Sequence, residues 1–167
     1  MQTTFHSPRL VITLGDPCGI SPELLLRSLA TIQRWASILV VGAKAGVDLL
    51  EAVPGRKVHW RWDEPDSDAP EVPGAARFGL WTGEPEDLAA GDPARLGHAT
   101  WIDPTPDIQV RDLVLGEPSA ASGRAAVEGV RIGAGLVMSG AADALVTLPL
   151  AKVAAHRAGF PIPGHTE

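Results

Sequence analysis

The sequence lacks several features that would point to particular classes of protein. It contains a single cysteine, Cys18, so no disulfide can form within the chain, and a reducing compartment is favoured. No run approaches the roughly 20 apolar residues of a membrane-spanning helix, and residues 1–9 lack a basic segment followed by an apolar one. The formal net charge is −6, and the sequence contains no block of Lys or Arg. Both observations argue against nucleic acid and anionic membranes as partners. We therefore expect a cytoplasmic protein.

What is present indicates a folded α/β protein. Hydrophobic residues make up 45% of the 167 positions and charged residues 20%, a balance that excludes disorder over the whole length. The opening predicts strand, helix, strand, helix over residues 9–14, 22–34, 37–41 and 43–53, with Ser21 as the N-cap of the first helix. Apolar runs without alternation are typical of strands buried on both faces, so we expect a parallel sheet with right-handed crossovers.

The middle of the chain gives weaker signals. Residues 58–62, 77–81 and 108–115 are predicted strands, whereas residues 63–74 are acidic and rich in proline, as in a solvated loop. The segment from 83 to 106 is rich in Pro and Gly. Four of the five tryptophans lie between Trp60 and Trp101, and we interpret them as anchors of loops on the sheet rather than as a stacking site.

Regular patterns return after Ser119. A long helix is predicted over residues 120–139 with Gly140 as its C-cap, then a buried strand over 144–148, a short helix over 152–158 and an extended tail over 160–167. Four glycines inside the long helix each weaken it by up to about 1 kcal/mol relative to Ala. We expect them to permit close helix packing, a subunit interface being one place for it.

Three segments could carry chemistry, because ligands of open α/β sheets bind beyond the carboxyl ends of strands. The first, Gly15–Glu23, offers a tight turn and a helix N-terminus, although a purely structural turn explains it better than a ligand contact does. The second places Lys152 shortly after a buried strand, where it could bind a phosphate or be an ordinary exposed lysine. The third, Gly164–Glu167, sets His165 beside Thr166, two hydrogen-bonding groups on an extended segment. His6, His59, His98 and His156 show no zinc spacing.

Three motifs in order resemble one enzyme family. Residues 11–23, VITLGDPCGISPE, are similar to the opening signature ITxGDPAGIGPE of the 4-hydroxythreonine-4-phosphate dehydrogenase family. Residues 116–126, GEPSAASGRAA, resemble its helix entry, and residues 143–167 resemble the stretch that ends in its GHTE motif. Cys18, Ser21, Leu148 and the pair Leu150–Ala151 depart from the pattern, whereas residues 55–110 show no resemblance.

The resemblance implies a three-layer α/β/α fold with a mostly parallel sheet, like isocitrate and isopropylmalate dehydrogenases, and incomplete in this chain. Residues 1–140 would form a first domain without its carboxyl-terminal strands, and residues 141–167 would begin the second. His165 and Thr166 match the substrate-contacting pair, with Lys152 and Asp16 as further substrate-binding candidates.

Family members are homodimers that use NAD and a divalent metal (Zn, Mg or Co). They oxidise 4-phosphooxy-L-threonine and decarboxylate the product during pyridoxal phosphate (vitamin B6) synthesis. Their three metal-binding histidines and main cofactor contacts are expected after the GHTE motif, so this segment alone should be inactive.

Two other functions remain open at the level of the sequence. The departures near Leu148 favour a related substrate such as threonate or erythronate 4-phosphate. A non-enzymatic remnant that binds a phosphorylated metabolite is the third alternative.

Overall fold

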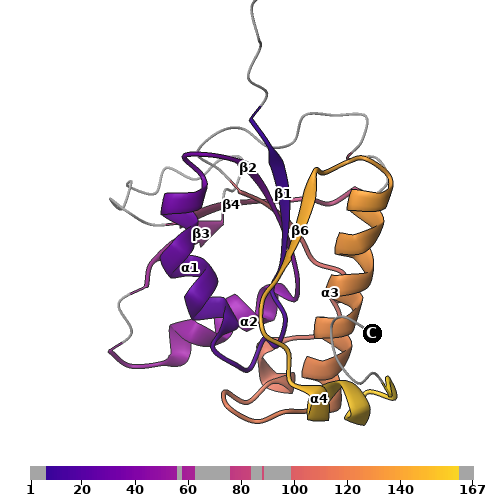
Figure 1. Cartoon of the computed structure of the whole chain (residues 1–167). Helices are drawn as coiled ribbons and strands as arrows, with labels where there is room; N and C mark the ends of the chain where they lie inside the picture. Colours follow the sequence, from indigo (N-terminus) through magenta and orange to yellow (C-terminus); the bar gives the residue numbers. More distant parts are fainter. Residues whose placement is uncertain (1–6, 56–57, 63–75, 84–87, 89–98, 162–167) are drawn as a thin grey trace, which may run out of the picture.

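A single parallel sheet organises the chain. The computed structural model describes residues 7–55, 58–62, 76–83, 88 and 99–161. Within these ranges six strands pair in the order β3-β4-β5-β2-β1-β6, and every ladder is parallel (Figure 1). Their bounds are β1 (Arg9–Thr13), β2 (Ser37–Val41), β3 (Trp60–Trp62), β4 (Ala76–Leu80), β5 (Ala99–Ile102) and β6 (Ala144–Thr147).

Helices lie on opposite sides of this sheet, as Figure 1 shows for α1 and α3. The α-helices are α1 (Ser21–Ile32), α2 (Lys44–Asp48), α3 (Ala120–Met138) and α4 (Lys152–Arg157), and the described 3-10 helices are η1 (Leu49–Ala52) and η3 (Val110–Asp112). The expected α/β fold with a parallel sheet and flanking helices is confirmed.

Alternate residues of each central strand enter two separate cores. Ile12 of β1 packs with Leu25 and Leu29 of α1, on what we call the α1 face. Val11 points the other way and packs with Leu136 of α3, on the α3 face. Because both faces are buried, β1 and β2 need apolar residues at nearly every position, which explains their unbroken hydrophobic runs.

Glycines let α3 approach the sheet closely. A Cβ on Gly133 would lie 2.8 Å from Cγ2 of Thr13, and one on Gly129 would lie 3.3 Å from the carbonyl oxygen of Val41. The close packing expected of these small residues therefore occurs within the chain, against β1 and β2.

Aromatic side chains build the other half of the core. The rings of Trp62, Phe78 and Trp101 have centroids 5.0–5.2 Å apart. Trp101 is fully buried, and its indole N–H donates to the carbonyl of Gly42 at 2.8 Å. Trp62 and Trp101 are thus residues of β3 and β5 themselves and pack in the core, rather than anchoring loops on the sheet as predicted.

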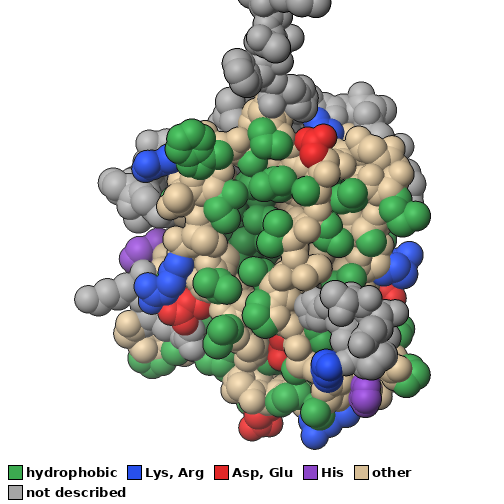
Figure 2. Space-filling model, in the orientation of Figure 1, with side chains coloured by type: hydrophobic (Ala, Val, Ile, Leu, Met, Phe, Trp, Pro, Cys, Tyr) green, Lys and Arg blue, Asp and Glu red, His purple; other side chains and the backbone are tan. Residues whose placement is uncertain are grey.

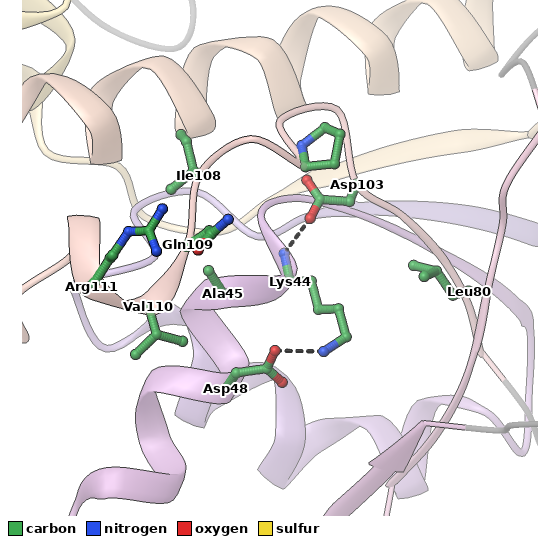
Figure 3. A pocket seen from close by; sticks show the side chains of 10 residues that line it. Lys44, Ala45, Asp48, Leu80, Asp103, Ile108, Gln109, Val110 and Arg111 are labelled. Atoms are coloured by element: carbon green, nitrogen blue, oxygen red, sulfur yellow. Dashed lines mark hydrogen bonds and ion pairs between the residues drawn. The ribbon is translucent and has the colours of Figure 1, made fainter.

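The connections that follow the neighbouring parallel strands β2 and β5 leave on opposite faces of the sheet. After β2 the chain passes to the α1 face, where Val47 and Leu50 pack, whereas after β5 it passes to α3 on the opposite face. Neighbouring strands whose connections leave on opposite faces create a crevice at their carboxyl ends. Here the backbone N–H of Lys44 donates to Oδ2 of Asp103 at 2.9 Å across that crevice (Figure 3).

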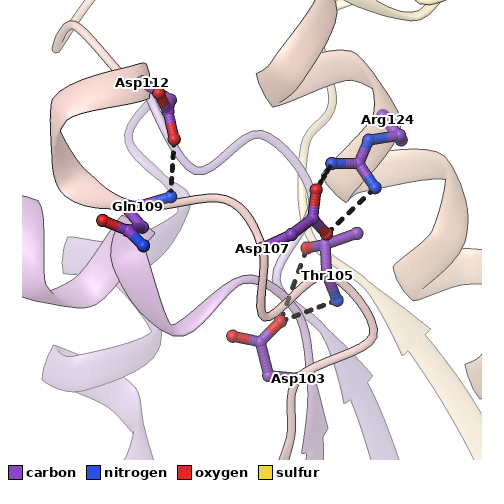
Figure 4. A network of polar contacts seen from close by, with 6 residues as sticks. All are labelled: Asp103, Thr105, Asp107, Gln109, Asp112 and Arg124. Atoms are coloured by element: carbon purple, nitrogen blue, oxygen red, sulfur yellow. Dashed lines mark hydrogen bonds and ion pairs between the residues drawn. The ribbon is translucent and has the colours of Figure 1, made fainter.

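The connection from β5 to α3 was predicted to contain a strand over residues 108–115, and this prediction is wrong. The segment holds the 3-10 turn η3 (Figure 4), which Gln109 and Asp112 close by a capping box. Asp103 accepts the N–H of Thr105 at 2.8 Å, and Asp107 forms an ion pair with Arg124 of α3. These local side-chain bonds replace the ladder that a strand would need.

Three further expectations need correction. Ser21 is the first residue of α1 rather than its N-cap, because its hydroxyl donates to the carbonyl of Pro149 instead. The helix expected over residues 43–53 divides into α2 and η1. Strand β5, within the Pro- and Gly-rich segment, was missed.

Residues 144–157, which the sequence analysis assigned to a second domain, add β6 to this sheet and pack α4 against α3. The division at residue 140 stays a prediction, because no described residue extends far enough beyond α4 to test it.

Strand β6 leaves an apolar edge. It pairs with β1 on one side, and no described strand pairs with its other side. Val146 shares the α1 face with Ile12, its ladder partner, yet it is 43% exposed. Hydrophobic side chains gather on the surface between α1 and β6 (Figure 2). No helix in the described ranges has the length and apolar character needed to cross a bilayer.

We predict that this edge makes the 167-residue chain self-associate. An unpaired strand edge with apolar side chains is a template for pairing, and an edge lysine opposes it. Val146→Lys should therefore shift the sedimentation coefficient toward that of a monomer. Met138→Lys is the matched control, because it removes a more exposed apolar side chain (88%) from the end of α3 and should leave association unchanged. A compact, stable monomer of the unaltered chain would contradict this prediction.

Candidate functional site

Two motif-bearing loops meet at the carboxyl ends of β1 and β6. The strands are in register, with Thr13 opposite Thr147, so the residues that follow them emerge side by side. The backbone N–H of Asp16 donates to the carbonyl of Pro149 at 2.9 Å. The hydroxyl of Ser21 donates to the same carbonyl, also at 2.9 Å. We call this region, residues 15–21 with 148–152, the β1–β6 corner.

Gly15 allows the two loops to approach. Its φ of +67° lies in the left-handed region, which favours glycine. A Cβ at this position would lie 2.3 Å from the carbonyl oxygen of Pro149 and 2.6 Å from that of Leu148. Both the backbone conformation and the space therefore require glycine.

Asp16 is a buried carboxylate that organises the first loop. It is 8% exposed, and its Oδ1 accepts the backbone N–H of Cys18 at 2.9 Å. Desolvation raises the pKa of Asp16 above its ordinary value, more than this N–H and the Ser122 hydroxyl lower it. Burial and the neighbouring Asp16 charge also raise the pKa of the Cys18 thiol. The thiol of Cys18 is therefore buried, and its raised pKa disfavours the thiolate, which is the reactive form.

The N-terminus of α3 forms the wall behind the corner. Ser119 caps the helix, its side chain accepting the N–H of Ser122 at 3.1 Å. Gly123 contacts α4 so closely that a Cβ would lie 1.9 Å from the carbonyl oxygen of Ala154. Because α4 begins at Lys152, this contact fixes where that lysine leaves the sheet.

Of the four candidate substrate-binding residues, the structure describes two. Asp16 and Lys152 both lie in the β1–β6 corner, Asp16 buried and Lys152 exposed at the start of α4. Leu148, which departs from the family pattern, packs its side chain against the α1-face core. His165 and Thr166 lie outside the described residues, and their substrate contacts stay a prediction.

The corner presents a lysine and backbone groups rather than a ready set of metal ligands. Across the described ranges no three His, Cys, Asp or Glu side chains gather closely enough to hold a metal ion. An exposed ammonium beside a rigid loop can bind an anionic group such as a phosphate.

Sequence reasoning missed Ser119, Ser122 and the carbonyl of Pro149. The serines carried a signal, since two hydroxyl residues spaced three apart before an apolar helix are typical of reciprocal capping. The role of Pro149 carried none, because a backbone carbonyl has no side-chain signature.

Comparison with known proteins gives consistent matches. The family model described as "Pyridoxal phosphate biosynthetic protein PdxA" matches residues 82–167. A 4-hydroxythreonine-4-phosphate dehydrogenase of Geobacter metallireducens is 32% identical over 162 residues, 96% of this chain and 41% of that protein. A D-threonate 4-phosphate dehydrogenase of Bordetella bronchiseptica is also 32% identical, over 99% of this chain and 41% of that protein.

Solved structures agree with the sequence matches. A 4-hydroxythreonine-4-phosphate dehydrogenase from Burkholderia phymatum superposes with a TM-score of 0.70 at 27% identity, covering 97% of this chain and 42% of that one. A similar structure from Salmonella typhimurium gives 0.66 at 26% identity, with 96% and 43% covered. The chain thus spans about two fifths of the length of these relatives.

Replacing Gly15 should separate the two loops of the corner. Gly15→Ala combines a left-handed conformation with steric overlap, so we expect the free energy of unfolding to fall by about 3 kcal/mol or more. Gly140→Ala is the matched control, because Gly140 has a φ of +80° but open space around its Cβ position. It should cost only about 1 kcal/mol. Urea denaturation of both variants checks this, and equal losses would show that the Pro149 contact is unimportant.

Asp16→Asn should change how stability depends on pH. Because the pKa of Asp16 is raised, the folded chain holds more protons than the unfolded chain as pH rises above 3.8. The contribution of Asp16 to the free energy of unfolding therefore falls as pH rises through this window. An asparagine cannot ionise, so the variant should gain stability relative to wild type as pH rises above 3.8, measured by urea denaturation.

Asp107→Asn is a control, because its stability relative to wild type should change with pH in the opposite direction. Arg124 lowers the pKa of Asp107, so that variant should lose relative stability as pH rises toward 3.8. The same trend in both variants would contradict the assignment of Asp16.

Proposed function

Because the chain belongs to the family of the pyridoxal phosphate biosynthetic protein PdxA, we propose that it is part of a dehydrogenase acting on 4-hydroxythreonine 4-phosphate (4-phosphooxy-L-threonine). In this proposal the enzyme uses NAD, works in pyridoxal phosphate synthesis, is cytoplasmic and is a homodimer. Since the chain covers about 41% of its relatives, it supplies one portion of the site.

The β1–β6 corner is the main structural support for this proposal. The bond between the N–H of Asp16 and the carbonyl of Pro149 joins the loops that carry two of the family-like motifs. Carboxyl ends of parallel strands are where α/β folds bind small molecules. Lys152 follows directly, so the corner can receive the phosphate end of a substrate.

Each candidate residue then has a distinct role. The ammonium of Lys152 binds the phosphate as a point charge. His165 and Thr166 hydrogen-bond the phosphate or a substrate hydroxyl, as the family motif implies. Asp16 acts as a positioning residue, because its carboxylate is buried and turned to the N–H of Cys18 rather than to solvent.

The cofactors belong to the complete enzyme. When bound, a divalent metal would supply Lewis-acid chemistry and NAD would supply a hydride acceptor. The described residues do not fit a metal, since no cluster of three ligand-type side chains occurs among them. We propose, from the resemblance to the family, that the metal ligands and main NAD contacts come from residues after the GHTE motif, and we expect the chain alone to be inactive.

D-threonate 4-phosphate is the second candidate substrate. Relatives of that name are 31–32% identical to this chain, as close as the 4-hydroxythreonine-4-phosphate enzymes. Leu150 and Ala151 replace a polar residue of the family pattern beside Lys152, and both are partly buried at the corner. A less polar wall favours a substrate without the ammonium group of 4-phosphooxy-L-threonine.

Activity should require a polypeptide that continues beyond residue 167. We expect such a protein, given NAD and a divalent metal, to form NADH with 4-phosphooxy-L-threonine or D-threonate 4-phosphate. Lys152→Gln should raise KM for the phosphorylated substrate about tenfold or more, because it removes a charge-assisted bond. Steady-state kinetics by NADH absorbance measure both effects.

Arg34→Gln is the matched control, because it removes a positive charge just after α1, before β2 begins, and should leave KM unchanged. An unchanged KM in Lys152→Gln would remove that lysine from the site. NADH formation by the 167-residue chain alone would show that its active site is complete.

A further inference from the structure

The crevice between β2 and β5 contains a cavity that the proposed dehydrogenase site does not use. Its volume is about 500 Å³, within the range of small-molecule sites. Lys44 follows β2, Asp103 follows β5 and Leu80 ends β4, so the cavity lies at the carboxyl ends of these strands. The strand β1 separates β2 from β6, so this cavity is distinct from the β1–β6 corner.

One wall of the cavity is apolar. Ala45, Leu80, Pro106, Ile108 and Val110 line it (Figure 3). Leu80 and Val110 are 44% and 38% exposed, so their apolar side chains can be reached from solvent. The hydrogen-bonded connection around Asp103, Asp107 and Asp112 holds this wall in place (Figure 4). The cavity is therefore preformed.

Most of the charged groups that line the cavity have a hydrogen-bond or ion-pair partner among the described residues, and one does not. Nζ of Lys44 lies 2.5 Å from Oδ2 of Asp48, and it lies 4.5 Å from the centre of the Trp62 ring. Both oxygens of Asp103 accept backbone N–H groups, those of Lys44 and Thr105. Arg111 also lines the cavity, and within the described ranges no acidic side chain pairs with its guanidinium.

We propose that this cavity binds a small amphipathic anion, a molecule with an apolar or aromatic body and one carboxylate or phosphate group. The body lies against Leu80, Ile108 and Val110, and the anionic group pairs with the guanidinium of Arg111. Guanidinium binds carboxylate and phosphate through two parallel hydrogen bonds, which gives this pairing its selectivity. Neither NAD nor the dehydrogenase substrate is needed for this binding.

Trp62 does not line the cavity, but it contacts Lys44 and Asp48, which do, and it can therefore report binding there. Its indole N–H donates to Asp48 at 3.0 Å, and its ring lies below Lys44. Protein labelled with 5-fluorotryptophan contains five tryptophans, and the Trp62→Phe variant identifies the resonance of Trp62. Titration with phenyl phosphate should shift that resonance and saturate. Phenol has the aromatic ring without the anionic group, and inorganic phosphate has the anionic group without the ring. Both should therefore bind more weakly than phenyl phosphate.

Two variants separate the parts of the site. Arg111→Gln should weaken phenyl phosphate binding about tenfold, whereas Arg34→Gln, an exposed arginine following α1, should not weaken it. Leu80→Ser should weaken phenyl phosphate but not inorganic phosphate. All three positions are exposed, so the fold should survive each substitution.

The possible results divide clearly. A saturable shift that Arg111→Gln weakens supports the site. The proposal is overturned by the absence of any shift at Trp62, by equal binding of phenol, or by equal binding of inorganic phosphate, which would indicate an adventitious anion only. These readings do not depend on enzymatic activity, so the failure of the dehydrogenase proposal would leave them unchanged.

Discussion

The hydrogen bond from the N–H of Asp16 to the carbonyl of Pro149 is the interaction on which the candidate site depends. It joins segments more than 130 positions apart and forms only because Gly15 adopts a left-handed conformation without a side chain. Parallel pairing of β1 with β6 supplies the register, and α3 supplies the support through its glycines. The candidate site therefore depends on the turn at Gly15 and Asp16, on the pairing of β1 with β6 and on the packing of α3.

The parts of the fold that could be predicted from sequence are those with local signals. The strands β1, β2 and β6 and the helix α3 follow from apolar runs that end at glycine or proline, and the structure contains all four. The strand β5 and the turn η3 could not be predicted in the same way. Residues 99–102 lie inside a Pro- and Gly-rich segment, and only pairing with β2 and β4 makes them a strand.

The candidate site was predictable only in part, for a related reason. A side chain such as Lys152 can be identified from its place after a strand, but the partner of Asp16 is a backbone carbonyl. The buried environment of Asp16 is likewise a property of tertiary packing, since Cys18 and Ser122 come from different segments. Asp16 accepts a bond from its own loop, a contact that the sequence did not indicate, and its substrate contact stays a prediction.

The edge-to-face arrangement of Trp62 and Trp101 has a spectroscopic consequence. Their ring centroids are 5.2 Å apart with an interplanar angle of 85°. Indoles this close exchange excitation energy, so their coupled transitions should add an exciton band to the circular dichroism spectrum. Because β3 carries one indole and β5 the other, the amplitude of that band reports the assembly of this half of the sheet without any added dye.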